Sequence, residues 1–531
     1  MRLTDIRAML AAVVVLAAPM AAWADEFLDR VNGSYATIRA NKRSDMVLLP
    51  LVAKMDAMPA SLTSIEDAMA MPAASSKWSA VEAWATAPAQ KAVLEAVKSV
   101  AKEENPLEAM AFGQPYGADA LATGPEGVAL IRAKLYTELG DPPLLAGAKF
   151  HHLSGLTKVT RLVNVEATRR AAAGDVVGAV DVLVDWLFFA RQMADRAMAT
   201  ETQWGLLTMS ATLERIRDVV YVDFRSDKRS LTAEQIATIL NRLREEGGYL
   251  RLDLLKFPPG DRIATEQVVD KTFSPDRGPD PVLFPTTMSR LASKETPLRL
   301  FAESSRWEKV ASMHMPRRPT IAMIADVFSD WEGRWQLDPF DAQQAIVTTY
   351  QRTMSTKVGP VMYGVLAATV RDLSELQLLR QMLRTQLVGT RGALGLVAFN
   401  ARAKGFPRDI SGIRPTFVKV IEADPFNPDR ANGKQPPLEF FVPIRDRKPI
   451  AGGDPAKPHE MNIVARGGAA NFQVKVSDDQ FILYSVGPNG AKDWAVNVTD
   501  APVRGSIGDV LIWPPVTSLV RQHLIETGQI K

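Results

Sequence analysis

Apolar residues recur at helical spacing through most of the first 400 positions of the chain. Trp78, Val81 and Trp84 are three residues apart, so their side chains share one face of a helix. The clearest apolar stripes cover three consecutive stretches, residues 153–173, 175–199 and 202–222. This pattern predicts amphipathic helices that pack as antiparallel hairpins.

Local signals mark where some of these helices begin and end. Gly174 is typical of a helix C-terminus and Asp175 of the N-cap of the next helix. Further along, Ser230 or Thr232 can accept hydrogen bonds from the free N–H groups of a first turn, and Ile236 then opens an apolar face. These signals predict separate helices on either side of each break.

The pattern changes in the last third of the chain. Residues 373–403 form a long apolar stripe that predicts one long helix, and Gly, Pro, Asp and Asn become frequent after Pro407. We predict a hairpin turn at Ser477-Asp-Asp479 between two of the strands. The strand candidates are Leu438–Val442, Asn471–Val476, Gln480–Val486 and Val510–Trp513.

These patterns predict a mainly α protein with a small α+β module near its C-terminus. We divide the chain into a helical segment over residues 25–145, a helical domain over 146–370 and a long helix plus sheet over 371–531. A proline-rich loop excursion interrupts the second segment at residues 257–319.

Residues 1–24 read as a cleavable signal peptide. Arg2 and Arg7 precede an apolar run, and Ala22-Trp23-Ala24 is an A-x-A cleavage site before Asp25. No later stretch is long and apolar enough to predict a membrane span. We therefore expect a periplasmic or secreted protein without a transmembrane segment.

Composition narrows the candidate functions. The chain has no cysteine, which excludes disulfides, thiolate metal sites and a thiol nucleophile. A formal net charge of +3 over 531 residues argues against an electrostatic nucleic-acid binder. The serine-hydrolase motif G-x-S-x-G, the zinc-protease motif H-E-x-x-H and the phosphate-binding P-loop are absent from the sequence, so no catalytic residues are assigned.

Several motifs of the last third occur in a characteristic order. They are Lys404-Gly-Phe-Pro407, Asp424-Pro-Phe426, Phe481-Ile-Leu-Tyr-Ser-Val-Gly-Pro-Asn-Gly490 and Gly508-Asp-Val-Leu-Ile-Trp-Pro-Pro515. In this order they resemble the soluble domain of type II secretion pseudopilins, with the major pseudopilins as the nearest type. The resemblance covers roughly residues 371–515 and implies a helix that leads into a small antiparallel sheet of three or four strands.

The chain departs from that family in one respect. The helix of a pseudopilin is N-terminal and sits in the membrane, whereas here it is internal and carries Arg380, Arg384 and Arg391. The resemblance therefore implies a shared fold and not a filament subunit. The whole chain also resembles a loosely defined group of exported bacterial helical proteins with such a C-terminal module, which supplies no activity to carry over.

The resemblance also implies an ion site. In major pseudopilins the corresponding loop binds calcium, and here that loop carries Asp493, Asp500 and Asp509. Calcium takes six to eight oxygen ligands, so three carboxylates would need backbone carbonyls in addition. A turn-rich loop without an ion is the alternative.

One aromatic cluster is a candidate binding face. Trp331 and Trp335 lie on the same side of a predicted helix, with Arg334 beside them. Such a face could bind a sugar or a peptide, and a buried packing seam is the alternative.

The function that we expect is that of an exported, non-enzymatic interaction or scaffold protein of the bacterial envelope. Its partners would be envelope or secretion-system proteins, because arrays of helical hairpins present extended binding surfaces. The alternative is a carboxylate-dependent hydrolase or lyase, which requires acidic side chains converging in a cleft between helical domains.

Overall fold

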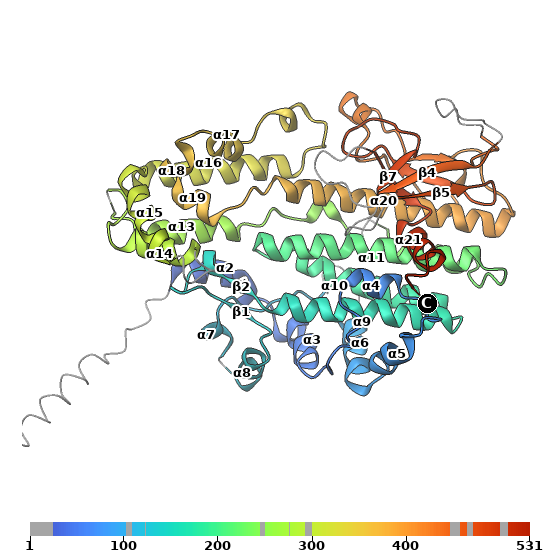
Figure 1. Ribbon diagram of the computed structural model, residues 1–531, viewed down its shortest axis with the longest axis horizontal. Coiled ribbons are helices and arrows are strands. Elements are labelled where there is room, and N and C mark those ends of the chain that lie inside the picture. The colour runs from blue at the N-terminus through green and yellow to red at the C-terminus, as the bar shows by residue number, and fades with distance from the viewer. Residues whose placement is uncertain are drawn as a thin grey trace, which may run out of the picture.

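The computed structural model describes residues 25–101, 109–122, 124–244, 250–275, 277–292, 300–446, 457–464, 471–499 and 508–530. The predicted signal peptide and Asp500 lie outside these residues. The chain is mainly helical with a small sheet near its C-terminus, as predicted. Its long helices run along the longest axis, and the sheet lies at one end of the molecule (Figure 1).

Four long helices form the centre of the molecule: α9 (His152–Ala172), α10 (Val176–Ala194), α11 (Ala199–Arg225) and α20 (Ser374–Ala403). The sequence of α10 is apolar on nearly all sides, which is the pattern of a helix surrounded by others. Accordingly, α10 packs against α9, α11, α6 (Pro88–Val100) and α12 (Ala233–Arg242).

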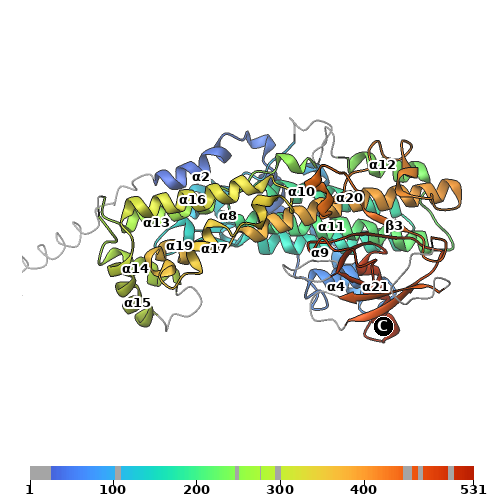
Figure 2. The same ribbon diagram turned by 90° about the horizontal axis from the view of Figure 1, so that it is seen from above.

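The remaining helices surround this centre. In the N-terminal part they are α2 (Glu26–Ala36), α3 (Ser44–Val52), α4 (Ile65–Ala70), α5 (Trp78–Ala85), α7 (Ala118–Leu121) and α8 (Pro125–Arg132). The end of the molecule away from the sheet contains α13 (Gly260–Thr272), α14 (Leu283–Ala292), α15 (Leu300–Met313), α16 (Arg317–Trp335), α17 (Thr349–Met354), α18 (Gly359–Met362) and α19 (Gly364–Thr369), as the view from above shows (Figure 2).

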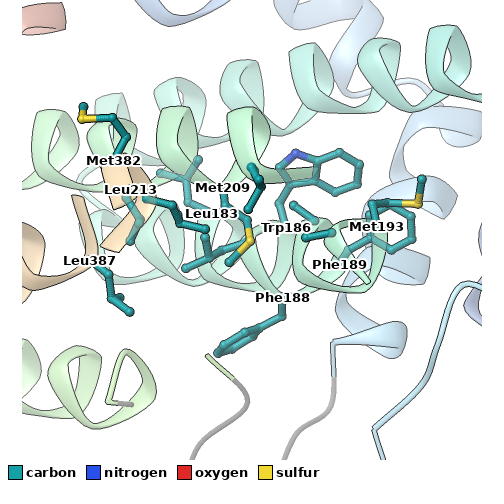
Figure 3. Packing of buried hydrophobic residues seen from close by; sticks show 14 of the residues in the cluster. Leu183, Trp186, Phe188, Phe189, Met193, Met209, Leu213, Met382 and Leu387 are labelled. Atoms are coloured by element: carbon teal, nitrogen blue, oxygen red, sulfur yellow. The ribbon is translucent and has the colours of Figure 1, made fainter. Parts of the chain in front are cut away.

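Large side chains fill the space between the central helices. Trp186 and Phe189 of α10 stack with ring centroids 4.9 Å apart. Figure 3 shows Met209 of α11 close to Trp186, and Leu387 of α20 farther along the same core. Each such side chain contributes about 1.5–3 kcal/mol when it is fully buried. One continuous core extends from Leu48 to Trp513, so all three predicted segments contribute to it.

The sheet is larger than predicted. It has six described strands in the order β3-β6-β8-β7-β4-β5, where three or four were expected, and two of its strand pairs, β4–β7 and β7–β8, are parallel. The strands are β3 (Glu439–Phe441), β4 (His459–Val464), β5 (Phe472–Val476), β6 (Ile482–Ser485), β7 (Asn497–Thr499) and β8 (Asp509–Trp513). The short strands β1 (Thr137–Glu138) and β2 (Lys149–Phe150) form a separate pair.

The predicted hairpin at Ser477–Asp479 is wrong. A turn is present, because Gln480 N–H donates to the Ser477 carbonyl at 3.1 Å. However, β5 pairs with β4, and β6 pairs with β3 and β8. The two strands that flank the turn therefore belong to different parts of the sheet.

Helices cover both faces of the sheet. On one face, α20 packs closely, and a Cβ at Gly389 would lie 2.7 Å from the side chain of Ile512 in β8. The other face is covered by α21 (Val516–Glu526), whose Leu519 packs in a cluster with Met461 and Leu511. Among the described residues, no helix is both long enough and apolar enough to cross a membrane.

Candidate functional site

A groove of about 340 Å³ lies where the helical part of the chain meets the C-terminal sheet. Its walls come from the end of α16 and the loop that follows, from the first turns of α20, and from two loops of the sheet region. The lining residues are Arg334, Leu337, Pro339, Gln344, Ile346, Thr348, Gln351, Ser374, Glu375, Gln377, Leu378, Gln381, Phe426, Pro488 and Asn489.

Amide side chains dominate the polar part of this lining. Gln344 donates to the carbonyl of Arg334 at 3.0 Å, and Gln351 donates to the Asp372 carboxylate at 2.7 Å. Gln381 donates to the Leu337 carbonyl at 3.1 Å, whereas its buried Oε1 has no hydrogen-bond partner among the described residues. The polar groups of the lining are therefore mostly uncharged amides that are held in place by bonds to the surrounding chain.

Arg334 shapes the groove by holding one wall in place. Its guanidinium pairs with Asp330 at 2.6 Å and donates to the carbonyls of Gln343 and Ile346 at 2.6 and 2.9 Å. These bonds fold residues 341–347 back onto α16. The short helix η6 (Ala342–Ala345) lies in this loop, and the side chain of Ile346 next to it is 60% exposed. The wall is therefore fixed in place and carries an accessible apolar residue.

The other two residues of the predicted aromatic face lie behind the groove. Trp331 and Trp335 are buried, and the indole N–H of Trp335 donates to the Leu255 carbonyl at 2.7 Å. Trp331 packs against Tyr350 with ring centroids 5.2 Å apart. Of the three candidate binding residues, only Arg334 lines the groove. The structure places the two tryptophans where the packing alternative expects them.

Two of the motifs quoted for the pseudopilin resemblance bind each other directly. The carboxylate of Asp424 accepts hydrogen bonds from Ser485 Oγ at 2.7 Å and from Val486 N–H at 3.0 Å. It also accepts from Phe426 N–H at 3.0 Å, and burial raises its pKa. This contact brings Phe426 and the loop after Ser485 to the same side of the groove.

The loop after β6 completes the groove with Pro488 and Asn489. Gly490 lies at φ +65°, and a Cβ there would lie 2.8 Å from the ring of Phe340. A side chain at this position would push the loop away from the wall that Arg334 holds. Arg430 adds an ion pair with Asp338 at 2.7 Å across the same junction. The groove is thus a product of contacts between the helical part and the sheet region.

The predicted calcium loop is only partly described. Asp509 is buried and accepts hydrogen bonds from the N–H groups of Ala495 at 2.7 Å and Asp493 at 3.3 Å. Asp493 accepts from the backbone and side chain of Asn497. Burial raises the pKa of Asp509 to about 7, with nearby Asp493 adding to the effect. Within the described ranges, no three His, Cys, Asp or Glu side chains form a metal-binding group, so calcium stays a prediction.

Most residues of the groove carry no signal that sequence reasoning could use. The glutamines at positions 344, 351, 377 and 381 sit in two different segments, and each reads alone as a solvent-exposed helical residue. The motifs at Asp424 and Ser485 indicate a fold in the sequence, but they do not indicate that this region lies next to α16.

No protein-family model matches the chain, and no curated protein or solved structure is significantly similar to it.

Proposed function

We propose that this chain is an exported interaction protein of the bacterial envelope and that the groove is its binding site. The observation that carries the proposal is the character of the lining. Amide and hydroxyl side chains lie among apolar ones in the lining, and Glu375 and Arg334 are its charged residues in the described structure. Such a surface suits an uncharged polar ligand with apolar groups, as a segment of a partner protein would provide.

The location in the envelope rests on the signal-peptide pattern before Asp25. An association with a secretion or surface assembly rests on the pseudopilin-like motifs. It is supported by the packing of the long helix α20 on the sheet and by the bonds of Asp424 to Ser485 and Val486.

The alternative of a carboxylate-dependent hydrolase or lyase receives less support from the same groove. That chemistry uses two carboxyl groups about 5–10 Å apart. Among the described residues that line the groove, Glu375 is the single carboxylic acid, and it is exposed. The binding role therefore accounts better for the lining.

A photo-crosslinking amino acid placed at Ile346 in cells of the native host tests the proposal. Position 346 is exposed in the groove wall, and Val282, 69% exposed near α14, serves as the matched control. We expect a discrete crosslinked adduct with an envelope protein from position 346 only. The adduct should weaken when Gln351→Leu and Gln381→Leu are added, because these changes remove polar contacts and keep the side-chain volume.

The proposal fails if positions 346 and 282 give the same adducts, or if the glutamine changes have no effect on a correctly folded protein. Mass spectrometry of the native protein tests the export. We expect a mature N-terminus at Asp25, and a protein that keeps residues 1–24 and stays in the cytoplasm would contradict the proposed export.

A further inference from the structure

Strand β5 forms one edge of the sheet. In the part of the sheet that the structure describes, its neighbour is β4 alone, with Gln473 opposite Asn462 and Lys475 opposite Glu460. Figure 1 shows β5 at the border of the sheet, close to α21. An unpaired edge presents backbone N–H and C=O groups to which another strand can bind.

The neighbouring strands determine which backbone groups point outward. The N–H of Asn462 donates to the Val496 carbonyl at 2.7 Å, so the backbone of Asn462 faces β7. The backbone N–H and C=O groups of successive residues in a strand point to opposite sides, so those of Met461 and Ile463 point toward β5. Gln473 lies opposite Asn462, whose backbone groups point away from β5. The backbones of Gln473 and Asn462 are therefore not hydrogen-bonded to each other. Gln473 and Lys475 therefore direct their backbone N–H and C=O groups away from β4.

A slot of about 280 Å³ follows this free edge. All five residues of β5 line the slot, although their side chains alternate between the two faces, so it runs along the edge of the strand. The end of α11 forms one wall with Tyr221, and α21 forms the other with Leu519 and His523. The imidazole of His523 stacks on Phe472 with ring centroids 4.3 Å apart. The edge is thus flanked by helices but left uncovered by the described chain.

A row of amide groups runs across the sheet and ends at the same edge. Asn497 Nδ2 donates to the Asp493 carboxylate at 2.8 Å, and Asn462 Nδ2 donates to Asn497 Oδ1 at 3.1 Å. Gln473 Nε2 then donates to Asn462 Oδ1 at 3.1 Å. The three bonds point in one direction, so Gln473 Oε1 is the acceptor at the outer end of the row.

We propose that β5 binds an extended segment of a partner protein as an additional strand. The backbone of that segment would bond to the outward N–H and C=O groups of Gln473 and Lys475. An Asn or Gln side chain opposite Gln473 would donate to its Oε1 and lengthen the amide row, as in stacked amide ladders. The residues on either side of that amide would face α21, where Phe472 and Leu519 favour apolar side chains. This surface shares no residue with the groove, so the proposal stands apart from the proposed function.

The direct probe is the peptide Thr-Val-Asn-Val-Thr, which carries fluorescein at its N-terminus and an amide at its C-terminus. Its control has Ala in place of Asn. Binding to the full-length protein is followed by fluorescence anisotropy, and hydrogen exchange reports on the amides of residues 472–476. We expect the Asn peptide to bind about fivefold more tightly than the Ala peptide, because it makes one more hydrogen bond. Exchange at Gln473 and Lys475 should slow when the peptide saturates the protein.

Two variants separate the backbone from the side-chain contribution. Lys475→Pro removes an outward N–H and leaves the bonds to β4 in place, so binding of both peptides should fall by about tenfold or more. Gln473→Leu keeps the size of the side chain and should abolish the preference for Asn over Ala. Gln435→Leu, at an exposed position outside both the slot and the groove, is the matched control and should change neither affinity.

The proposal is overturned if the peptides do not bind at millimolar concentration, or if bound peptide leaves the exchange of β5 unchanged. It is also overturned if concentrated protein protects Gln473 and Lys475 without peptide, because a second copy of the chain then occupies the edge. Should Lys475→Pro unfold the sheet, as circular dichroism would show, the Asn preference of wild type against Gln473→Leu decides the matter.

Discussion

At the scale of single residues, the most demanding arrangement is a fully buried ion pair. Arg196 Nε lies 3.0 Å from Glu201 Oε1, and both side chains are almost completely inaccessible. His152 approaches the same carboxylate at 3.0 Å, and Tyr116 donates to it at 2.5 Å. Burial opposes ionisation of Glu201, but Arg196 outweighs it and lowers the pKa to about 2. The rings of Tyr35 and Tyr116 lie over the guanidinium at 4.1 and 4.5 Å.

We predict that Glu201→Gln destabilises the protein by about 3–5 kcal/mol, because it leaves the buried charge of Arg196 without a counter-charge. Urea denaturation followed by circular dichroism measures the change in the free energy of unfolding. The exposed pair between Lys434 and Asp429 is the control, and Lys434→Ala should cost at most about 1 kcal/mol. Equal effects of the two substitutions would contradict the prediction.

Asp509 should lower the stability of the protein as pH rises, which is opposite to the effect of a carboxylate whose pKa is lowered by folding. Its pKa is about 7 in the folded protein against an ordinary value of 3.8, so the native state binds an extra proton between about pH 4 and 7. The contribution of Asp509 to the free energy of unfolding is therefore greatest below this window and falls as pH rises through it.

Melting temperatures of wild type and Asp509→Asn at pH 5 and pH 8 test this prediction. Buried His314 and His459, whose pKa values are lowered by burial, change stability in the other direction in both proteins. The difference between the two proteins isolates Asp509. We expect wild type to lose stability relative to Asp509→Asn on going from pH 5 to pH 8, and a constant difference would contradict the raised pKa.

At the scale of elements, the sequence predicted helices better than strands. Asp175 accepts from Gly178 N–H, and Thr232 forms a capping box with Gln235, as the cap signals indicated. The long helix at 373–403 is confirmed as α20. Strands β4 and β7 were missed because one contains His459, Glu460 and Asn462 among its apolar residues and the other has only three residues. Their pairing depends on contacts far along the chain, which local periodicity does not record.

The candidate site was predictable to a smaller degree. Arg334, which the sequence places beside two tryptophans, lines the groove. Its role in holding residues 341–347 through their carbonyls has no sequence signature, because these bonds exist only once the loop has folded back onto α16. The glutamines of the groove come from separate segments, and only the fold brings Gln351 and Gln381 together. A hollow between elements is a property of packing, so periodicity does not reveal it.

The contact between the two C-terminal motifs predicts a large effect for Asp424→Ala. The substitution leaves the donors of Ser485, Val486 and Phe426 without their acceptor, so we expect a loss of about 3 kcal/mol. Faster hydrogen exchange over residues 482–487 and a lower melting temperature would show it. Asp429→Ala, an exposed change in the same region, should leave both measurements nearly unchanged. Comparable losses of stability from the two variants would contradict the role of Asp424.

The calcium prediction is best tested above pH 7, where Asp509 is ionised. An ion that binds the native state must raise the melting temperature, by an amount that grows with its concentration. We expect millimolar calcium to raise the melting temperature of wild type at pH 8 and a chelator to reverse the change. Asp493→Asn should reduce the shift, and an unchanged melting temperature in wild type would end the proposal of an ion in this loop.

At the scale of the whole molecule, α21 connects distant parts of the chain. Arg521 forms ion pairs with Asp218 of α11 at 2.6 Å and donates to the carbonyls of Met69 and Ala70 at the end of α4. Burial favours the neutral form of Asp218, but Arg521 and Arg215 outweigh it and lower the pKa to about 2. One side chain thus joins α4, α11 and the helix that covers the sheet.

We predict that Arg521→Leu loosens α21 from the rest of the molecule. Two backbone carbonyls lose their donor, and Asp218 keeps only Arg215 as a charged partner, so limited proteolysis should cut more readily within residues 514–530. The melting temperature should fall as well. Gln522→Ala removes an exposed neighbour on the same helix and serves as the control; equal protease sensitivity of both variants would contradict the role of Arg521.

The bond between Arg521 and Ala70 joins residues 451 positions apart. A chain that crosses a membrane or leaves the ribosome with its N-terminal end first presents α4 long before α21 has emerged. Until residues 516–526 arrive, one face of the sheet and the buried Asp218 have no cover. The contacts of α21 therefore form after the first helices have emerged, and until then the apolar side of β4 around Met461 is open to chaperones.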